Sequence, residues 1–325
     1  MAKIYFNIIT LFPQFFASPL QTSLLAKSQE KDIVEINLHD LRDFGIGKHK
    51  QVDDKPFGGG PGMVLRVDVL KKSLDTVKGS TLAIKGREKP HVILLDPSGD
   101  KFNQDKAIKL SKVKQIILIC GHYEGVDERF KQYVDEEISI GDYVLNGGEV
   151  AALVVVESVS RLVPGFLGKA ASAENESFVQ SIQKGKNVRL SRKRRILFIC
   201  GHYEGVDERF KQYVDEEISI GDYILNGGEV AALVLIESVA RLIPGFLGKA
   251  ASTESESFAP SIQNGKNVRL LDYPSYTRPE NYEGEEVPKI LLSGNHKEIE
   301  QWRKSKAIEK TKKVRPDLIN IYTSK

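Results

Sequence analysis

Three short loops carry residue types that suit small-ligand binding, and each follows a stretch that is typical of a β-strand. They cover residues 96–99, 121–125 and 140–148. Open α/β folds bind ligands at strand ends of this kind. Loops of backbone amides and small residues suit a flat heterocycle held edge-on, such as adenine, although each loop taken singly also fits an ordinary turn. Neither a Walker A loop nor a Gly-x-Gly-x-x-Gly helix start is present, which disfavours a nucleotide triphosphate or dinucleotide site.

A fourth loop, residues 52–63, is too rich in glycine for a packed element, and its composition predicts a mobile substrate loop. Its two carboxylates, Asp53 and Asp54, could serve a loosely bound Mg²⁺ together with Asp142. Hard cations are commonly held by few protein ligands plus water. Since no clear ligand spacing follows from that, no protein-built metal site is predicted.

The elements that must position these loops alternate between short β-branched runs and helical patterns. Strands are predicted at 4–11, 34–38, 91–95, 115–120 and, more weakly, 137–140; helices are predicted at 16–29, 67–74, 104–111, 126–134 and, as a long apolar helix, 148–162. This alternation predicts an α/β fold with a mainly parallel sheet. After a proline-punctuated stretch at 273–279, a capped basic helix at 296–312 predicts a small, mostly helical C-terminal domain.

The middle of the chain occurs twice. Residues 116–190 (copy one) and 196–270 (copy two) align without a gap at an offset of 80 and differ at 12 of 75 positions. A solenoid array is the alternative, but such arrays need three or more units with caps. Removing one repeat leaves 245 residues, a length that suits one enzyme or two small domains. We therefore favour an insertion-like duplication.

Composition indicates a globular protein, with 41% hydrophobic and 28% charged residues in 325. The sequence has no apolar run long enough to cross a bilayer, and its N-terminus lacks the apolar region of a signal peptide. Its two cysteines, Cys120 and Cys200, hold the same place in the two copies. This predicts buried thiols in a reducing, cytoplasmic setting and argues against a disulfide framework.

Positive charge is concentrated in two places although the net charge is only +3. Residues 184–195 hold seven Lys or Arg in twelve, and residues 296–325 hold nine against four Asp or Glu. Phosphate-backbone binding needs such clusters. A solvated surface explains either cluster equally well when it is taken alone.

Residues 52–63, 121–130, 139–149, 161–168 and 271–279 together resemble the bacterial tRNA (guanine-N1)-methyltransferases, which belong to the SPOUT class. The resemblance covers essentially the whole chain, with the middle counted twice. It implies a SPOUT-type parallel sheet with a deep trefoil knot, in which the three strand-end loops bind S-adenosylmethionine in a bent form. It also implies methyl transfer to N1 of guanosine 37 in tRNA, with S-adenosylhomocysteine as product.

Carried over position by position, the resemblance implies two sets of binding residues. The first set is the cofactor shell, which is formed by copy one and the strand-end segment that precedes it. Its residues are Leu95, Pro97, Gly99, Gly121, Tyr123, Glu124, Gly125, Ile140, Gly141, Tyr143, Leu145 and Gly148. The matching positions of copy two are Gly201, Tyr203, Glu204, Gly205, Ile220, Gly221, Tyr223, Leu225 and Gly228. The tRNA contacts are Asp53, Gly58, Gly59 and Arg278. Asp96 stands where the family usually has serine.

Methylation of guanine N1 needs a base, because N1–H is weakly acidic and N1 keeps its proton at neutral pH. In the family an aspartate before Ser-Phe is assigned this task, and here Glu176 and Glu256 hold that position. A carboxylate beside a desolvated base can accept the proton, and a guanidinium can stabilise the charge that develops on O6. Arg161 and its repeat Arg241 match the family arginine.

The duplication repeats the long apolar helix predicted at 148–162 and the loops at 121–125 and 140–148, but it does not repeat the first three predicted strands. We therefore expect one complete cofactor site per chain, built with copy one, and we expect Glu256, which is nearer the C-terminal domain, to be the base. The expected domains are 1–190 (methyltransferase domain with copy one), 191–258 (copy two) and 259–325 (linker and tRNA-binding helical domain). The family enzyme is a homodimer. Copy two could imitate that dimer within the chain, be buried between chains, or thread a second knot.

Two other functions remain open. A duplicated core could have lost catalysis and serve as a scaffold that binds tRNA or cofactor, but intact motifs in both copies argue against decay. Another SPOUT methyltransferase, acting on ribose or another base, is disfavoured by the loop at 52–63 and by the C-terminal domain.

Overall fold

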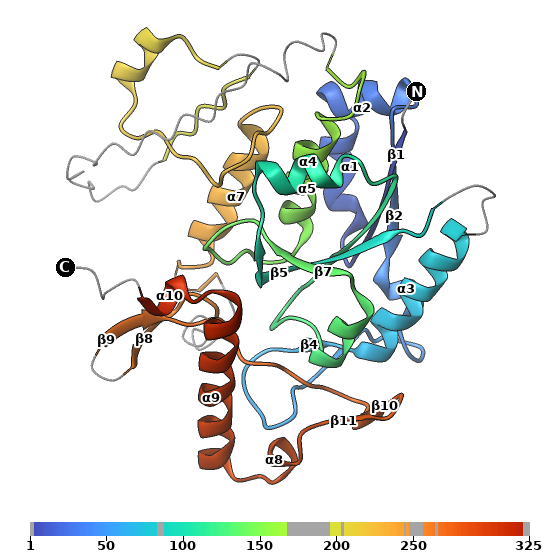
Figure 1. Ribbon diagram of the computed structural model, residues 1–325, viewed down its shortest axis with the longest axis vertical. Helices are drawn as coiled ribbons and strands as arrows, with labels where there is room; N and C mark the ends of the chain where they lie inside the picture. The colour runs from blue at the N-terminus through green and yellow to red at the C-terminus, as the bar shows by residue number, and fades with distance from the viewer. Residues whose placement is uncertain are drawn as a thin grey trace.

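A central sheet of five parallel strands carries the fold in the computed structural model of this chain (Figure 1). The structure describes residues 3–82, 88–167, 196–202, 205–243, 245–246, 256–263 and 266–320. The strand order is β2 (Val34–Asp40), β1 (Ile4–Thr10), β6 (Gln115–Cys120), β5 (His91–Lys101) and β7 (Glu136–Ser139). Every neighbouring pair is parallel. The predicted α/β fold with a mainly parallel sheet is confirmed.

Side chains alternate between the two faces of the sheet, as the pleat requires. In β6, Ile116 and Leu118 belong to one buried cluster, while Ile117 and Ile119 belong to the other. The first face is covered by η1 (Pro13–Phe16), α1 (Ala17–Leu20), α2 (Ser23–Glu30), α4 (Gln104–Leu110) and α5 (Glu149–Ser160). The second is covered by η2 (Leu41–Phe44), α3 (Val67–Leu82) and η3 (Glu128–Tyr133).

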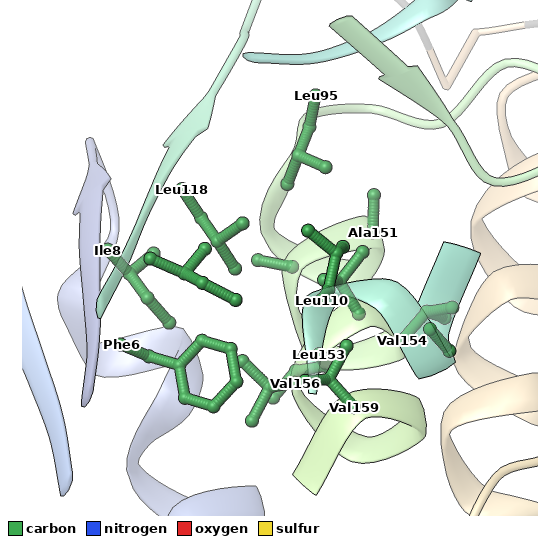
Figure 2. Packing of buried hydrophobic residues seen from close by; sticks show 14 of the residues in the cluster. Phe6, Ile8, Leu95, Leu110, Leu118, Ala151, Leu153, Val154, Val156 and Val159 are labelled. Atoms are coloured by element: carbon green, nitrogen blue, oxygen red, sulfur yellow. The ribbon is translucent and has the colours of Figure 1, made fainter. Parts of the chain in front are cut away.

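Helix α5 is the apolar helix that the sequence predicts at 148–162. It is buried at every position except Glu157, because it packs on β1 and β6, on α4 and, on another side, on α7 (Glu229–Ala240). A helix that is apolar all round is stable only when it is buried all round. Figure 2 shows Leu153 and Val156 of α5 in the same buried cluster as Phe6 of the sheet and Leu110 of α4.

Copy two lies in a different environment although its sequence is nearly the same. Helix α7 differs from α5 at three positions, yet only Val230 and Val234 are buried in it. The described residues 196–200, which correspond to β6, form no strand: Ile117 is 0% exposed and its counterpart Leu197 is 86% exposed. A single strand position lies between β1 and β5, and β6 occupies it. Helix η4 (Glu208–Tyr213) repeats η3 without any buried residue.

Four predicted elements differ in detail. The segment 126–134 forms the 3-10 helix η3 instead of an α-helix, and the helix predicted at 16–29 is broken into η1, α1 and α2. Residues 96–99 lie inside β5, where the pairing with β7 shifts register between Leu95 and Asp100. The glycine-rich loop is closed by a short antiparallel pair, β3 (Asp53–Asp54) with β4 (Val64–Leu65).

The C-terminal part is built around one long helix. Its elements are β8 (Pro260–Gln263), β9 (Lys266–Arg269), β10 (Asn281–Tyr282), β11 (Glu285–Glu286), α8 (Lys289–Leu292), α9 (His296–Val314) and α10 (Asp317–Asn320). Asn295 caps α9 by accepting a hydrogen bond from Glu298 N, as the sequence predicts. No helix in the described part of the chain is long and apolar enough to span a membrane.

Candidate active site

A cavity opens at the register shift within β5 and at the carboxyl ends of β6 and β7, where residues 96–98 meet the loops at 121–125 and 140–148. Its empty volume is about 1090 Å³, including space open to solvent. Ten residues of the predicted cofactor shell line it: Leu95, Pro97, Gly121, Tyr123, Glu124, Gly125, Ile140, Tyr143, Leu145 and Gly148. The fold thus brings together loops that are far apart in the sequence.

Two glycines let the loops approach backbone to backbone. A Cβ on Gly148 would lie 2.6 Å from Cys120 Cα and 3.0 Å from Gly121 N, so a side chain there would separate the loops. The approach is held by Gly148 N, which donates to Gly121 O at 2.8 Å. A Cβ on Gly121 would lie 3.3 Å from Leu95 O. The cavity wall is therefore made largely of backbone at this point, which suits edge-on hydrogen bonding to a flat ring.

Gly99 and Gly141 do not line the cavity, although the resemblance assigns them to the cofactor shell. A Cβ on Gly99 would meet the backbone of β7 at 2.5 Å, so this glycine lets two strands pack closely. Gly141 lies against the Tyr143 ring, which a Cβ would approach to 2.3 Å. In this structure both glycines shape the loops that line the cavity.

The opposite wall of the cavity comes from copy two and the C-terminal part. Arg241 follows the end of α7, and its Nη1 contacts Glu256 Oε2 at 2.6 Å. The two side chains are 10% and 15% exposed. Both residues line the same cavity as the copy-one loops. Thus one cavity combines the cofactor-type loops of copy one with the predicted catalytic pair of copy two.

A half-buried ion-pair cluster stands at the wall of the cavity. Lys131 Nζ lies 3.3 Å from Asp96 Oδ2 and 2.7 Å from Glu137 Oε2. Burial opposes ionisation of Asp96, but Lys131, Lys310 and hydrogen bonds from Ser98 outweigh it and hold the pKa of Asp96 below its usual range. Asp96 is therefore charged, and it is held by Ser98 N and Oγ at 2.8 and 2.6 Å.

Asp272 is a further acidic group in the cavity wall. Burial raises the pKa of Asp272 to about 7, and the charge of Lys310 opposes this rise. The carboxylates of Asp96, Glu124 and Glu256 add to it. A carboxyl group that changes charge near neutral pH in a cavity is a common feature of functional sites.

The copy-two residues that the resemblance assigns to a cofactor shell lie elsewhere. Gly201, Gly205, Ile220, Gly221, Tyr223, Leu225 and Gly228 are outside the lining of this cavity. Tyr223 is buried between the copies, where its ring lies 5.1 Å from the Phe102 ring. Arg161 is buried at the end of α5 and does not line the cavity. Glu176, Tyr203, Glu204 and the basic cluster at 184–195 lie outside the described residues.

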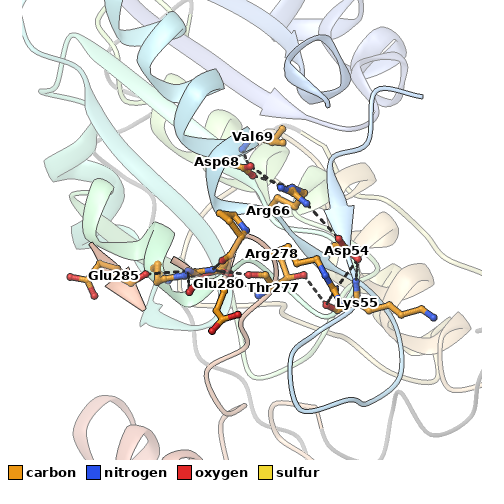
Figure 3. Close-up of polar contacts among 12 residues, drawn as sticks. Asp54, Lys55, Arg66, Asp68, Val69, Thr277, Arg278, Glu280 and Glu285 are labelled. Atoms are coloured by element: carbon orange, nitrogen blue, oxygen red, sulfur yellow. Dashed lines mark hydrogen bonds and ion pairs between the residues drawn. The ribbon is translucent and has the colours of Figure 1, made fainter. Parts of the chain in front are cut away.

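The predicted tRNA contacts lie around the glycine-rich loop, which the C-terminal part holds in place. Arg278 Nη1 lies 3.2 Å from Asp54 Oδ1, and Thr277 Oγ1 donates to Lys55 O at 2.8 Å (Figure 3). Gly59 O accepts from Arg303 Nη2 at 2.6 Å. Gly58 packs against α9, and Asp53 pairs with Leu65 in the β3–β4 hairpin.

Two of the three carboxylates considered for Mg²⁺, Asp54 and Asp142, are engaged with arginines. Asp142 receives both terminal nitrogens of Arg315 at 2.7 and 2.9 Å. Asp54 lies near Arg66 as well as Arg278. Within the described ranges no group of three or more His, Cys, Asp or Glu residues is placed to hold a metal ion.

Sequence reasoning missed four charged residues of the cavity wall, namely Glu128, Lys131, Asp272 and Lys310. Asp272 stands in a motif that carries the resemblance, so that motif could have pointed to it. Lys131 and Lys310 lie on helical segments with many surface lysines, and nothing in their sequence context separates them from the others.

A parallel α/β sheet with a loop-built cavity at its strand ends, closed by an arginine–glutamate pair, defines an α/β enzyme. The family model for tRNA (Guanine-1)-methyltransferase TrmD matches the chain twice, over residues 4–187 and 180–321, and the chain belongs to this family. The two overlapping matches are consistent with the duplication.

Curated relatives match over nearly the whole chain. The tRNA (guanine-N(1)-)-methyltransferase of Carboxydothermus hydrogenoformans is 37% identical over 315 residues, which is 97% of this chain and 87% of the relative. The protein of the same name from Clostridium tetani is 38% identical over 316 residues, covering 97% and 92%.

Proposed function

We propose that this protein transfers a methyl group from S-adenosylmethionine to N1 of guanosine 37 in tRNA. The observation that carries the proposal is the Arg241–Glu256 pair, which faces a cavity built from the three strand-end loops. Membership of the family supports the reaction class. Relatives identical to this chain at more than a third of the aligned residues are named tRNA (guanine-N(1)-)-methyltransferases.

The cavity fits the cofactor in shape and in charge. We assign the adenine ring to the part of the cavity that is lined by backbone at Gly121 and Gly148. The carboxylates of Glu124, Glu256 and Asp272 line the same cavity and favour the positive sulfonium and ammonium groups. When bound there, S-adenosylmethionine supplies an electrophilic methyl group.

The chain's own residues then manage the proton and the charge of guanine. Glu256 accepts the N1 proton as the methyl group arrives, which is general base catalysis. Arg241 uses Nη1 to hold Glu256, and its Nε is buried without a hydrogen-bond partner among the described residues. We assign the remaining donors of this guanidinium to O6, where negative charge develops.

We further propose that each chain forms one complete site by itself, with copy two replacing a second subunit. Support comes from reciprocal contacts between the copies: Tyr143 Oη donates to Ile220 O at 3.0 Å, and Tyr223 Oη donates to Ile140 O at 3.1 Å. Such pairs are what a two-fold interface would make. The trefoil knot of the SPOUT class belongs to this proposal, supported by a sheet order in which β6 separates β1 from β5.

The test is methyl transfer from labelled S-adenosylmethionine to tRNA transcripts that differ only at position 37. Methylation of the guanosine transcript and not of the adenosine transcript is the expected result. Binding of tRNA and cofactor without transfer would support a scaffold instead. Transfer to both transcripts would point to ribose or to another base, and would overturn the proposal. The same assay with a chelator added tests whether transfer needs Mg²⁺.

A further inference from the structure

The loop at residues 140–148 is held from outside by residues of copy two. Asn146 N donates to Glu237 Oε2 at 3.2 Å, and Ile140 O accepts from Tyr223 Oη at 3.1 Å. Ile140 and Asn146 line the cavity, whereas Glu237 and Tyr223 do not. Copy two therefore contacts both ends of a loop whose other side faces the ligand space.

Glu237 lies on the same helix face as Arg241, one turn earlier. Arg241 faces the cavity, while Glu237 faces the loop. Burial raises the pKa of Glu237, and Asn146 N–H and the charge of Arg241 oppose that rise. A single turn of helix α7 thus fixes the position of the loop relative to the catalytic pair.

The symmetry-related contact gives a natural comparison. Glu157 Oε2 accepts from Asn226 N at 3.3 Å, so copy one holds the matching loop of copy two in the same way. Asn226 does not line the cavity. Glu237 and Glu157 hold the same position in the two copies, and each accepts a hydrogen bond from a backbone N–H. Only Glu237 does so on a loop that lines the cavity.

We propose that Glu237 is a positioning residue for the cofactor site: by holding Asn146 N, with Tyr223 on Ile140, it fixes loop 140–148 in the conformation that receives S-adenosylmethionine. This inference rests on the proposed function. It gives copy two a second task besides the supply of Arg241 and Glu256. The loop is ordered before the ligand arrives, and preorganisation of this kind strengthens binding.

The experiment compares matched variants of the full chain. Glu237→Leu removes the acceptor, and we expect it to weaken binding of S-adenosylhomocysteine about tenfold in calorimetry. The KM for S-adenosylmethionine should rise in parallel, with kcat changed less than about threefold. Glu237→Gln keeps an acceptor and should restore most of the affinity. Glu157→Leu leaves an equal unpaired N–H in copy two and should change affinity by less than about twofold.

Equal weakening by Glu237→Leu and Glu157→Leu, or no weakening by either, would overturn the positioning role. Because leucine at these sites could impair folding, the smaller replacements Glu237→Ala and Glu157→Ala, which also remove the acceptor, are compared by amide hydrogen exchange. Exchange at Asn146 should be faster only in Glu237→Ala, and unchanged protection there overturns the inference. This measurement needs no cofactor. The unsubstituted chain could fail to bind S-adenosylhomocysteine or to transfer methyl while the exchange result is as expected. In that case the proposed function would be wrong, but the role of Glu237 in holding the loop would stand.

Discussion

Arg241 and Glu256 form an ion pair of 2.6 Å in a cavity whose facing loops belong to the other copy of the repeat. Their counterparts Arg161 and Glu176 have the same sequence context, but Arg161 does not line this cavity and Glu176 lies outside the described residues. The two arginines therefore stand in unequal positions relative to the cavity. The first predictions depend on this inequality.

Replacing the proposed base should abolish most of the rate. Glu256→Gln keeps the shape but removes the proton acceptor, and we expect kcat to fall by about 100-fold or more. Glu176→Gln should stay close to the unsubstituted rate in the same single-turnover assay. Unchanged turnover in Glu256→Gln together with lost turnover in Glu176→Gln would mean that copy one supplies the base.

Arg241→Lys tests whether the catalytic rate depends on the positive charge of Arg241 alone or also on the geometry of its guanidinium donors. Lysine keeps the positive charge but loses the planar set of donors that holds Glu256 and leaves further donors for O6. We expect kcat to fall about 100-fold, with affinity for S-adenosylhomocysteine nearly unchanged. Rapid-quench kinetics and calorimetry measure the two quantities. Arg161→Lys serves as the matched variant, and an equal loss of rate there would contradict the assignment of the working arginine to copy two.

If each site is built within one chain, mixing two inactive variants should not restore activity. We expect about one S-adenosylhomocysteine bound per chain, and no activity when Glu256→Gln is mixed with Gly121→Val. The first variant keeps the loops and the second keeps the base. If sites formed between chains, random pairing in a dimer would restore about a quarter of the activity. Sedimentation of the same mixtures shows whether chains associate at all.

Asp272 should make stability fall as the pH rises. Its pKa is about 7 in the folded chain and about 3.9 for an unperturbed aspartate. Between these values the folded state holds a proton that the unfolded state has released, so stability declines through this window and stays lower above it. Asp272→Asn should therefore raise Tm at pH 8 by about 2–4 °C and leave it unchanged at pH 4. An equal Tm difference at both pH values would argue against this titration.

Much of the site could be predicted because its parts are local. The loops at 121–125 and 140–148 follow strand patterns, and parallel strands bring their carboxyl ends to one edge of the sheet. Lys131 and Lys310 could not be found in this way, because their role depends on Asp96 and Asp272, which reach them only through folding. Gly99 was placed in the cofactor shell, but in the structure its backbone packs on β7.

The sequence by itself determined the parallel α/β fold, the strand-end loops and the existence of two nearly equal copies. It left open which copy joins the sheet, since α5 and α7 have almost the same residues. The tertiary structure decided this. One strand position lies between β1 and β5, and β6 of copy one fills it, so α5 is buried while copy two turns α7, Arg241 and Glu237 toward the loops of copy one. The reason is physical: burial depends on which surfaces are available to cover a segment, and two nearly identical segments cannot both occupy one such place.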